Sequence, residues 1–147
     1  MHHPVILQSG IRSRSPLPAM PAIARVLVVD DDPLIVQLLA AMLTRDGFAV
    51  EAMTDSTEAL ARLAEEPAAF VALVTDHDMP RMCGTELIDR ARLAGFRGKV
   101  ILHSGSVHGA DAAEKVRRAD AVLAKPSGVR SIVPTLHALL APQALAC

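Results

Sequence analysis

Short apolar runs alternate with stretches of helical periodicity along most of the chain. Two of the runs, at 25–29 and 70–75, are continuously apolar apart from Arg25 and Thr75 at their ends, which is typical of strands that are buried on both faces. Weaker runs of the same kind lie at 48–52, 99–103 and 121–124. The pattern therefore predicts five short strands.

The segments between these runs carry apolar residues at helical spacing. The first predicted helix is the clearest, because six apolar residues share one expected face: Leu34, Ile35, Leu38, Leu39, Met42 and Leu43. Asp32 is expected to cap this helix ahead of Pro33, and the glycine of the segment 46–48 is expected to end it.

Four further helices are predicted at 56–65, 84–94, 108–118 and 128–140. The last has an apolar face formed by Ile132, Val133, Leu136, Leu139 and Leu140. The helix at 108–118 has mostly alanine on its apolar face besides Val116, so it is expected to be thinly anchored and mobile. Strict alternation of strands and helices predicts an α/β sandwich around a parallel sheet.

Polar side chains stand at the ends of four of the predicted strands. Asp30 and Asp31 follow the first strand, Asp76 ends the third, Ser104 follows the fourth and Lys125 follows the fifth. In an open parallel sheet, ligands bind outside the carboxyl ends of the strands. These side chains are therefore expected to converge on one crevice.

The residue types in this crevice favour phosphate chemistry. Clustered carboxylates repel one another, and a hard divalent cation such as Mg²⁺ relieves the repulsion, often together with a substrate phosphate. Ser104 and Lys125 would then contact phosphoryl oxygens, while Asp76 would attack phosphorus. Taken singly, these residues are equally compatible with helix caps, a turn and a surface lysine, but their joint spacing favours the phosphate interpretation.

Composition sets broader limits on the protein. A chain of 147 residues with 51% hydrophobic and 21% charged residues fits one globular domain. No apolar run approaches a membrane span, and the net charge of −1 gives no general attraction to DNA. Cys83 and Cys147 are too few for a disulfide framework, which suits a reducing cytoplasm. We expect a flexible tail at 1–23, with Met20 as an alternative start, a domain at 24–142 and a short tail at 143–147.

Four segments resemble, in order, the landmark motifs of the receiver domain of two-component response regulators. These segments are RVLVVDDDP, LVTDHDMPRMCG, VILHSGS and VLAKP. The resemblance, which runs from about Arg25 to Leu140, implies a flavodoxin-like (βα)₅ fold of the CheY-like type with strand order 2-1-3-4-5. It also implies phosphorelay signalling, in which a sensor histidine kinase or a phosphotransfer protein phosphorylates Asp76, rather than enzymatic turnover.

The resemblance implies a ligand set for Mg²⁺. Asp31 would bind the metal directly, and Asp30 would bind it chiefly through water. Asp76 would be both metal ligand and phosphoacceptor, and the backbone carbonyl of Asp78 would complete the protein ligands. Gly84 matches the loop that follows the phosphorylation site.

Further positions match the family on the strands that follow. Ser104 stands at the Ser/Thr switch position, Gly105 supplies a small residue beside the phosphate, and Lys125 would pair with the phosphoryl group. Pro126 completes a Lys-Pro peptide that is usually cis in the family. Val122 departs from the pattern, because the family commonly has Phe or Tyr there, so switching must use another rearrangement.

The end of the chain also departs from many family members. Only PQALAC follows the last predicted helix, so a stand-alone receiver without an output domain is expected. Its output would pass to another protein, and a homodimer is left open.

Three other functions remain as alternatives. Asp76 and Asp78 reproduce the Asp-x-Asp of haloacid-dehalogenase-like phosphatases. Those enzymes have a further acidic pair downstream of this motif, whereas Asp30 and Asp31 lie upstream of it. A pseudo-receiver that docks without phosphorylation is the second, and a metal sensor using His77, His103 and His108 is the third. His103 is expected to be a packed, hydrogen-bonded histidine and His77 to face the site entrance. The side chain of Asp78 is a candidate for tuning dephosphorylation.

Overall fold

The strands lie where the apolar runs predict them, within a residue or two. The structure, a computed structural model, describes residues 23–142; most of the expected N-terminal tail, Met20 and the tail at 143–147 lie outside the described residues. The strands are β1 (Arg25–Val29), β2 (Ala49–Met53), β3 (Ala72–Asp76), β4 (Lys99–Ser104) and β5 (Ala121–Ala124). All pair in parallel in the order β2-β1-β3-β4-β5, as predicted.

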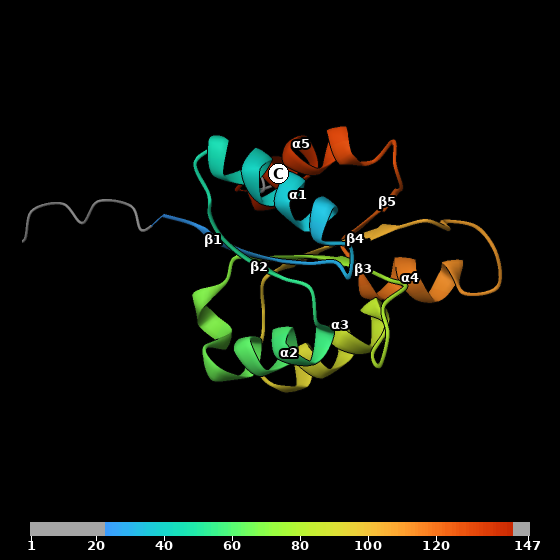
Figure 1. Ribbon diagram of the computed structural model, residues 1–147. Coiled ribbons are helices and arrows are strands. Elements are labelled where there is room, and N and C mark those ends of the chain that lie inside the picture. Colours follow the sequence, from blue (N-terminus) through green and yellow to red (C-terminus); the bar gives the residue numbers. More distant parts are fainter. Residues whose placement is uncertain (1–22, 143–147) are drawn as a thin grey trace, which may run out of the picture.

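The helices cover both faces of this sheet. They are α1 (Pro33–Arg45), α2 (Ser56–Glu65), α3 (Gly84–Leu93), α4 (Ala112–Arg118) and α5 (Val129–Leu140), with a short 3₁₀ turn, η1 (Pro67–Ala69), before β3. Figure 1 shows α1 and α5 on one face of the sheet and α2, α3 and α4 on the other. None of the helices within the described range 23–142 is long and apolar enough to cross a membrane.

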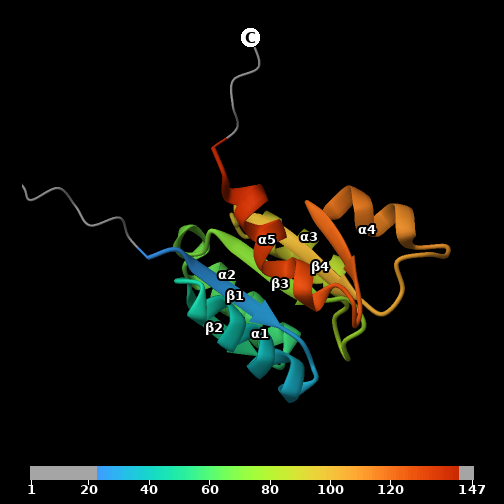
Figure 2. The ribbon, with the colours of Figure 1, turned by 90° about the horizontal axis from the view of Figure 1, so that it is seen from above.

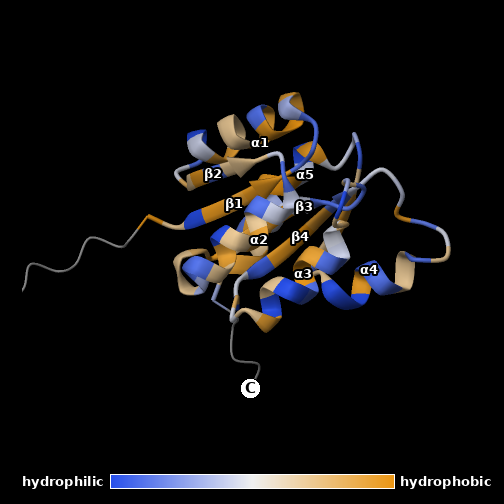
Figure 3. Ribbon diagram, turned by 60° about the horizontal axis from the view of Figure 1, so that its bottom comes forward, coloured by the Kyte–Doolittle hydropathy of each residue, from blue (hydrophilic) through white to orange (hydrophobic). Residues whose placement is uncertain are grey.

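Strand β1 shows why its sequence is continuously apolar. Val26 and Val28 pack in the cluster beneath α1 and α5, whereas Leu27 and Val29 pack in the cluster on the side of α2 and α3. All four are buried, because helices cover both faces of the strand. The view in Figure 3 shows the strands as a largely apolar layer between helices of mixed character.

The register of the strands aligns their carboxyl ends. Val29 at the end of β1 pairs with Thr75, and Asp76 at the end of β3 pairs with His103. Ser104 in turn pairs with Ala124, the residue before Lys125. The polar residues that follow these strands are therefore brought to the carboxyl end of the sheet. Figure 2 shows the arrangement of the strands from above.

Helix α1 is capped as predicted, but fewer of its apolar residues are buried than the sequence suggests. Asp32 accepts a hydrogen bond from the backbone N–H of Leu34, and Gly47 follows the helix at φ +99°. The buried residues are Val36, Leu39 and Leu43. Leu34 and Leu38 are 75% and 49% exposed, so their predicted place on the inward face is wrong. Leu39 and Leu43 pack in the core cluster of this face, whereas Leu34 and Leu38 lie on the solvent side of the helix.

Helix α4 differs most from expectation. It begins at Ala112 rather than at 108, because residues 105–111 form a connection that arcs away from the body of the domain (Figure 1). Val116, the expected apolar anchor, is 66% exposed. The residue that points inward is Lys115, so the helix contacts the domain through a cation and not through an apolar stripe.

Candidate functional site

Three carboxylates meet where β1 and β3 end. One oxygen from each of Asp30, Asp31 and Asp76 lies within 4.8 Å of the others. Asp30 is fully buried and Asp76 is 4% exposed, while Asp31 is open to solvent. The backbone holds the two buried carboxylates in place: the N–H of Asp32 donates to Asp30 Oδ1 at 2.9 Å, and the N–H of His77 donates to Asp76 Oδ1 at 2.8 Å.

Lys125 joins this cluster from the end of β5. Its Nζ lies 2.8 Å from Asp30 Oδ2 and 3.2 Å from Asp76 Oδ1. Its backbone N–H donates to the carbonyl of Ser104 at 2.7 Å, which ties the loop to the end of β4. The Lys125–Pro126 peptide is cis, as the family resemblance implies. The ammonium therefore bridges the two buried carboxylates.

The charges of the cluster are only partly balanced. Burial, and after it the charge of Asp30, raises the pKa of Asp76 to about 6, although Lys125 and the N–H of His77 act in the opposite direction. Burial on its own would lower the pKa of Lys125, but its hydrogen bond to Asp30 and the charges of both carboxylates outweigh burial and raise it. One ammonium among three carboxylates leaves excess negative charge in the site.

The residues fit a hard divalent cation. All donors in the trio are carboxylate oxygens, and the exposed carboxylate of Asp31 leaves the site open to water and to a further ligand. Mg²⁺ prefers oxygen donors and keeps several waters when it binds through few carboxylates. Burial, and after it the charge of Asp30, raises the pKa of Asp76, and a bound cation would offset both effects. The acidic trio is thus typical of a magnesium site.

Ser104 lies at the edge of this site but turns its hydroxyl elsewhere. The side chain is fully buried at the end of β4. Its hydroxyl donates to the carbonyl of Ser106 at 2.9 Å and accepts from the N–H of Ser106 at 3.2 Å and from Lys115 Nζ at 3.3 Å. Sequence reasoning missed Lys115, although its spacing from Ala112 and Ala119 puts it on the alanine face of the helix.

The loop after β3 closes tightly on the site. The N–H of Gly84 donates to the carbonyl of His77 at 2.8 Å, and a Cβ at Gly84 would lie 2.3 Å from the carbonyl oxygen of Asp76. Only glycine fits there without a shift of the backbone. Asp78 is exposed within the loop. At Gly105, by contrast, a Cβ would meet no atom within 4 Å.

Within residues 23–142, His77, His103 and His108 do not come together as a metal site. His103 is buried as predicted, but neither ring nitrogen has a hydrogen-bond partner, so the expected hydrogen bond is wrong. Burial, and after it the charge of Lys125, lowers the pKa of His103, which favours the neutral ring. His77 Nε2 lies 3.5 Å from Asp111. Among residues 23–142, the group that could share a metal is the carboxylate trio, which includes neither these histidines nor His108.

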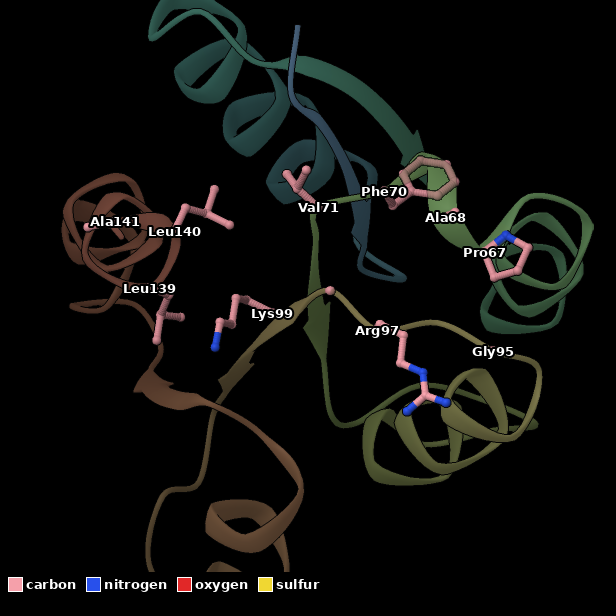
Figure 4. A pocket seen from close by; sticks show the side chains of 11 residues that line it. Pro67, Ala68, Phe70, Val71, Gly95, Arg97, Lys99, Leu139, Leu140 and Ala141 are labelled. Atoms are coloured by element: carbon pink, nitrogen blue, oxygen red, sulfur yellow. The ribbon is translucent and has the colours of Figure 1, made fainter. Parts of the chain in front are cut away.

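A hollow of about 660 Å³ lies away from these residues (Figure 4). It is lined by residues near the beginnings of β3 and β4 and by the end of α5, among them Phe70, Val71, Lys99, Leu139 and Leu140. Because the strands are parallel, this is the opposite end of the sheet from the acidic trio. The hollow therefore takes no part in the site described above.

Known proteins share this fold and part of this sequence. Residues 26–137 match the response regulator receiver domain family. The response regulator MprA of Mycobacterium avium is 34% identical over 122 residues, which are 79% of this chain and 50% of that protein. The chain thus spans about half the length of the curated relatives it matches.

Solved structures of similar size superpose over most of the chain. A CheY-like receiver domain protein from Methanospirillum hungatei gives a TM-score of 0.73 at 28% identity, over 80% of this chain and 93% of that one. TrrA from Thermotoga maritima, a response regulator in complex with Mg²⁺ and BeF, gives 0.70 at 25% identity, over 80% and 100%. The motifs, the strand order and the acidic trio agree with these matches. The chain belongs to the response regulator receiver domain family, whose members are phosphoacceptor modules of phosphorelay signalling rather than enzymes.

Proposed function

We propose that Asp76 is the phosphoacceptor of this receiver and that phosphorylation requires Mg²⁺. The observation that carries the proposal is the convergence of Asp30, Asp31 and Asp76 with Lys125, which reaches both buried carboxylates from another strand. TrrA, a relative with the same fold, binds Mg²⁺ and BeF. With a pKa of about 6, Asp76 is mostly an anion at neutral pH and is available as a nucleophile.

The metal would be held mainly by carboxylates. Asp31 and Asp76 would bind Mg²⁺ directly, Asp30 would bind it chiefly through water, and the backbone carbonyl of Asp78 would complete the protein ligands. When bound, Mg²⁺ would neutralise negative charge on the carboxylates and on the incoming phosphoryl group. This arrangement is open to solvent because Asp31 is exposed.

Asp76, Lys125 and Ser104 would each have a separate role in the transfer of the phosphoryl group. A carboxylate oxygen of Asp76 forms the new O–P bond, while the N–P bond of a phosphohistidine breaks and its electron pair stays with the departing imidazole. Lys125 holds the Asp76 carboxylate and would pair with a phosphoryl oxygen. Ser104 would donate its hydroxyl hydrogen to another phosphoryl oxygen once it leaves its present partners.

The partners follow from the same chemistry. We propose a sensor histidine kinase or a phosphotransfer protein as the donor and an unidentified protein as the target, with residues 24–142 as the receiver domain. Direct DNA binding is not part of the proposal, since the net charge is −1. A cytoplasmic location is proposed because two unpatterned cysteines suit a reducing compartment.

Phosphoryl transfer can be tested by intact mass. The wild type and Asp76→Asn are incubated with acetyl phosphate and Mg²⁺, with Asp46→Asn as a control that removes an acid at the end of α1, away from the trio. We expect one phosphoryl group on the wild type and on the control, and none on Asp76→Asn or after chelation of Mg²⁺. A wild type that stays unmodified with every donor would identify a pseudo-receiver instead. Sustained, Asp76-dependent hydrolysis of a phosphate monoester would identify a phosphatase.

A further inference from the structure

Lys115 is buried although it is a lysine on a short surface helix. The structure describes all of α4, and Lys115 is its one buried residue, with a side chain that is 2% exposed. Lysine is almost never fully buried unless its ammonium is paired. The neighbouring Val116, which would suit an apolar contact, points to solvent instead. The inward contact of α4 is therefore a polar one.

The ammonium of Lys115 meets the segment that follows β4. Its Nζ donates to the carbonyl of Ser106 at 2.6 Å and to the hydroxyl of Ser104 at 3.3 Å, and it lies 3.7 Å from a carboxylate oxygen of Asp111. A hydroxyl has one hydrogen to donate and two lone pairs that accept. Ser104 uses the hydrogen on the Ser106 carbonyl and both lone pairs on Lys115 and the Ser106 N–H.

The Ser104 hydroxyl therefore has no free hydrogen-bonding position for a phosphoryl oxygen. Ser104 can donate to a phosphoryl oxygen on Asp76 only if it withdraws its hydrogen from the Ser106 carbonyl. A rotation about the Cα–Cβ bond of Ser104 that turns the hydroxyl toward Asp76 moves its oxygen, so this rotation would also break the contact with Lys115. A buried ammonium that loses an acceptor is destabilised in proportion to its burial.

The other attachments of α4 give little resistance to such a change. Arg118 pairs with Asp89 on α3 at 2.8 Å, but this ion pair is substantially exposed and such pairs contribute little to stability. On β5, Val122 is partly buried against the apolar cluster and has no ring to fill the place of a family aromatic. Lys115 is thus the buried link between α4 and the phosphorylation site.

We infer that Lys115 is a positioning residue that holds the Ser104 hydroxyl in its unphosphorylated orientation and transmits the movement of that hydroxyl to α4. The inference rests on the proposed function, because it requires a phosphoryl group on Asp76. In the resting protein, the ammonium stabilises the Ser104 orientation that cannot reach the phosphoryl group. On phosphorylation, Ser104 leaves, and Lys115 keeps the Ser106 carbonyl but loses one of its two hydrogen-bond acceptors, which weakens the polar anchor of α4.

The test uses a double-mutant cycle between the two side chains. Affinity for the phosphoryl mimic BeF₃⁻ with Mg²⁺ is measured by calorimetry on the wild type, Lys115→Met, Ser104→Ala and the double variant. Lys115→Met is expected to bind BeF₃⁻ about three- to tenfold more tightly than the wild type, because only the resting state loses a hydrogen bond. In the Ser104→Ala background, the same change should leave the affinity unaltered.

Hydrogen exchange of the α4 amides gives a second readout. Exchange should rise when BeF₃⁻ binds the wild type, and it should already be raised in Lys115→Met and Ser104→Ala without ligand. Ser104→Thr, which keeps the hydroxyl, should restore the wild-type behaviour. Arg117→Met removes a cation from the exposed side of the same helix and should change neither affinity nor coupling.

The outcomes separate the inference from the function on which it rests. Equal affinity changes in both Ser104 backgrounds, or α4 exchange that BeF₃⁻ leaves unchanged in a wild type that binds it, would overturn the inference alone. A wild type that binds no BeF₃⁻ and accepts no phosphoryl group would overturn the proposed function as well. If Lys115→Met does not fold, unchanged α4 exchange in Ser104→Ala is enough to reject the coupling.

Discussion

Lys125 Nζ lies 2.8 Å from Asp30 Oδ2, although the two residues are 95 positions apart in the chain. They come from β1 and β5, which are not neighbours in the sheet, and Asp76 from the intervening β3 shares the same ammonium. One cation therefore supports two buried carboxylates. The stability of the domain should depend on this balance in ways that can be measured.

Lys125→Met should destabilise the metal-free protein. It leaves Asp30 and Asp76 buried without their cation, and breaking such a pair costs about 3–5 kcal/mol in free energy of unfolding. The loss should shrink in acid, where Asp76 is protonated, and on addition of Mg²⁺. Urea unfolding followed by far-ultraviolet circular dichroism is suitable, since the chain has no Trp or Tyr to report by fluorescence.

Lys99→Met is the matched control for that variant. Lys99 lies at the beginning of β4, at the other end of the sheet from the acidic trio. We expect it to change the free energy of unfolding by less than about 1 kcal/mol, with no dependence on Mg²⁺. Similar losses in both variants would show that the ammonium of Lys125 has no special electrostatic role.

Asp76→Asn should be more stable than the wild type at neutral pH without metal. Burial and the charge of Asp30 raise the pKa of Asp76 from 3.8 to about 6. In this window the native state binds more protons than the unfolded state, so the stability of the wild type falls as pH rises through it. The variant lacks this loss and should gain up to about 3 kcal/mol above pH 6.

The pH dependence of that difference is the decisive measurement. Unfolding of both proteins is compared in the presence of a chelator from about pH 4 to pH 8. The two stabilities should converge below about pH 4, and Mg²⁺ should favour the wild type at neutral pH. A difference that stays constant across the range would contradict a raised pKa at Asp76.

Gly84→Ala should destabilise the domain and impair the site together. The new Cβ would lie 2.3 Å from the carbonyl oxygen of Asp76, so the loop after β3 must shift. We expect a loss of about 2–3 kcal/mol in free energy of unfolding and weaker binding of Mg²⁺. Gly105→Ala is the control, because a Cβ there meets no atom within 4 Å. Equal effects of both changes would contradict this account of the loop.

Asp78→Asn should speed the loss of the phosphoryl group from Asp76. The carboxylate of Asp78 is exposed two residues after Asp76, the proposed phosphoacceptor, where its charge would repel an attacking hydroxide. Solvent screening limits the effect to about fivefold. The decay of phosphorylated protein, followed by intact mass after donor removal, measures it. Equal decay rates would leave Asp78 as a solvated loop acid, and slower decay would mean that it orients water instead.

Much of this architecture follows from sequence because local and global preferences agree. The run at 25–29 is apolar at every position but the first, and only a strand covered on both faces buries it fully. The sequence could place Asp30, Asp76 and Lys125 together, because parallel strands have their carboxyl ends at the same end of the sheet. No detail of side-chain packing was needed for either inference.

The sequence was less informative where polarity and burial disagree. Lys115 is buried and Val116 is exposed, the reverse of what hydropathy suggests, because the ammonium finds oxygen acceptors in the segment after β4. His103 is buried with both ring nitrogens unpaired, so a rule that buried polar groups are bonded fails there. In both cases the burial and the hydrogen bonding of the side chain depend on neighbours that are distant in sequence or lie in irregular segments.

The two edges of the sheet also decide how copies of this domain can meet. β2 is one edge, and it carries Glu51 in its middle, bound by Arg62 Nε at 2.8 Å. β5 is the other edge and is only four residues long. A charged or very short edge strand resists addition of a strand from another molecule. The domain is thereby protected against open-ended polymerisation through its backbone, and any specific association is left to side chains on its helices and loops.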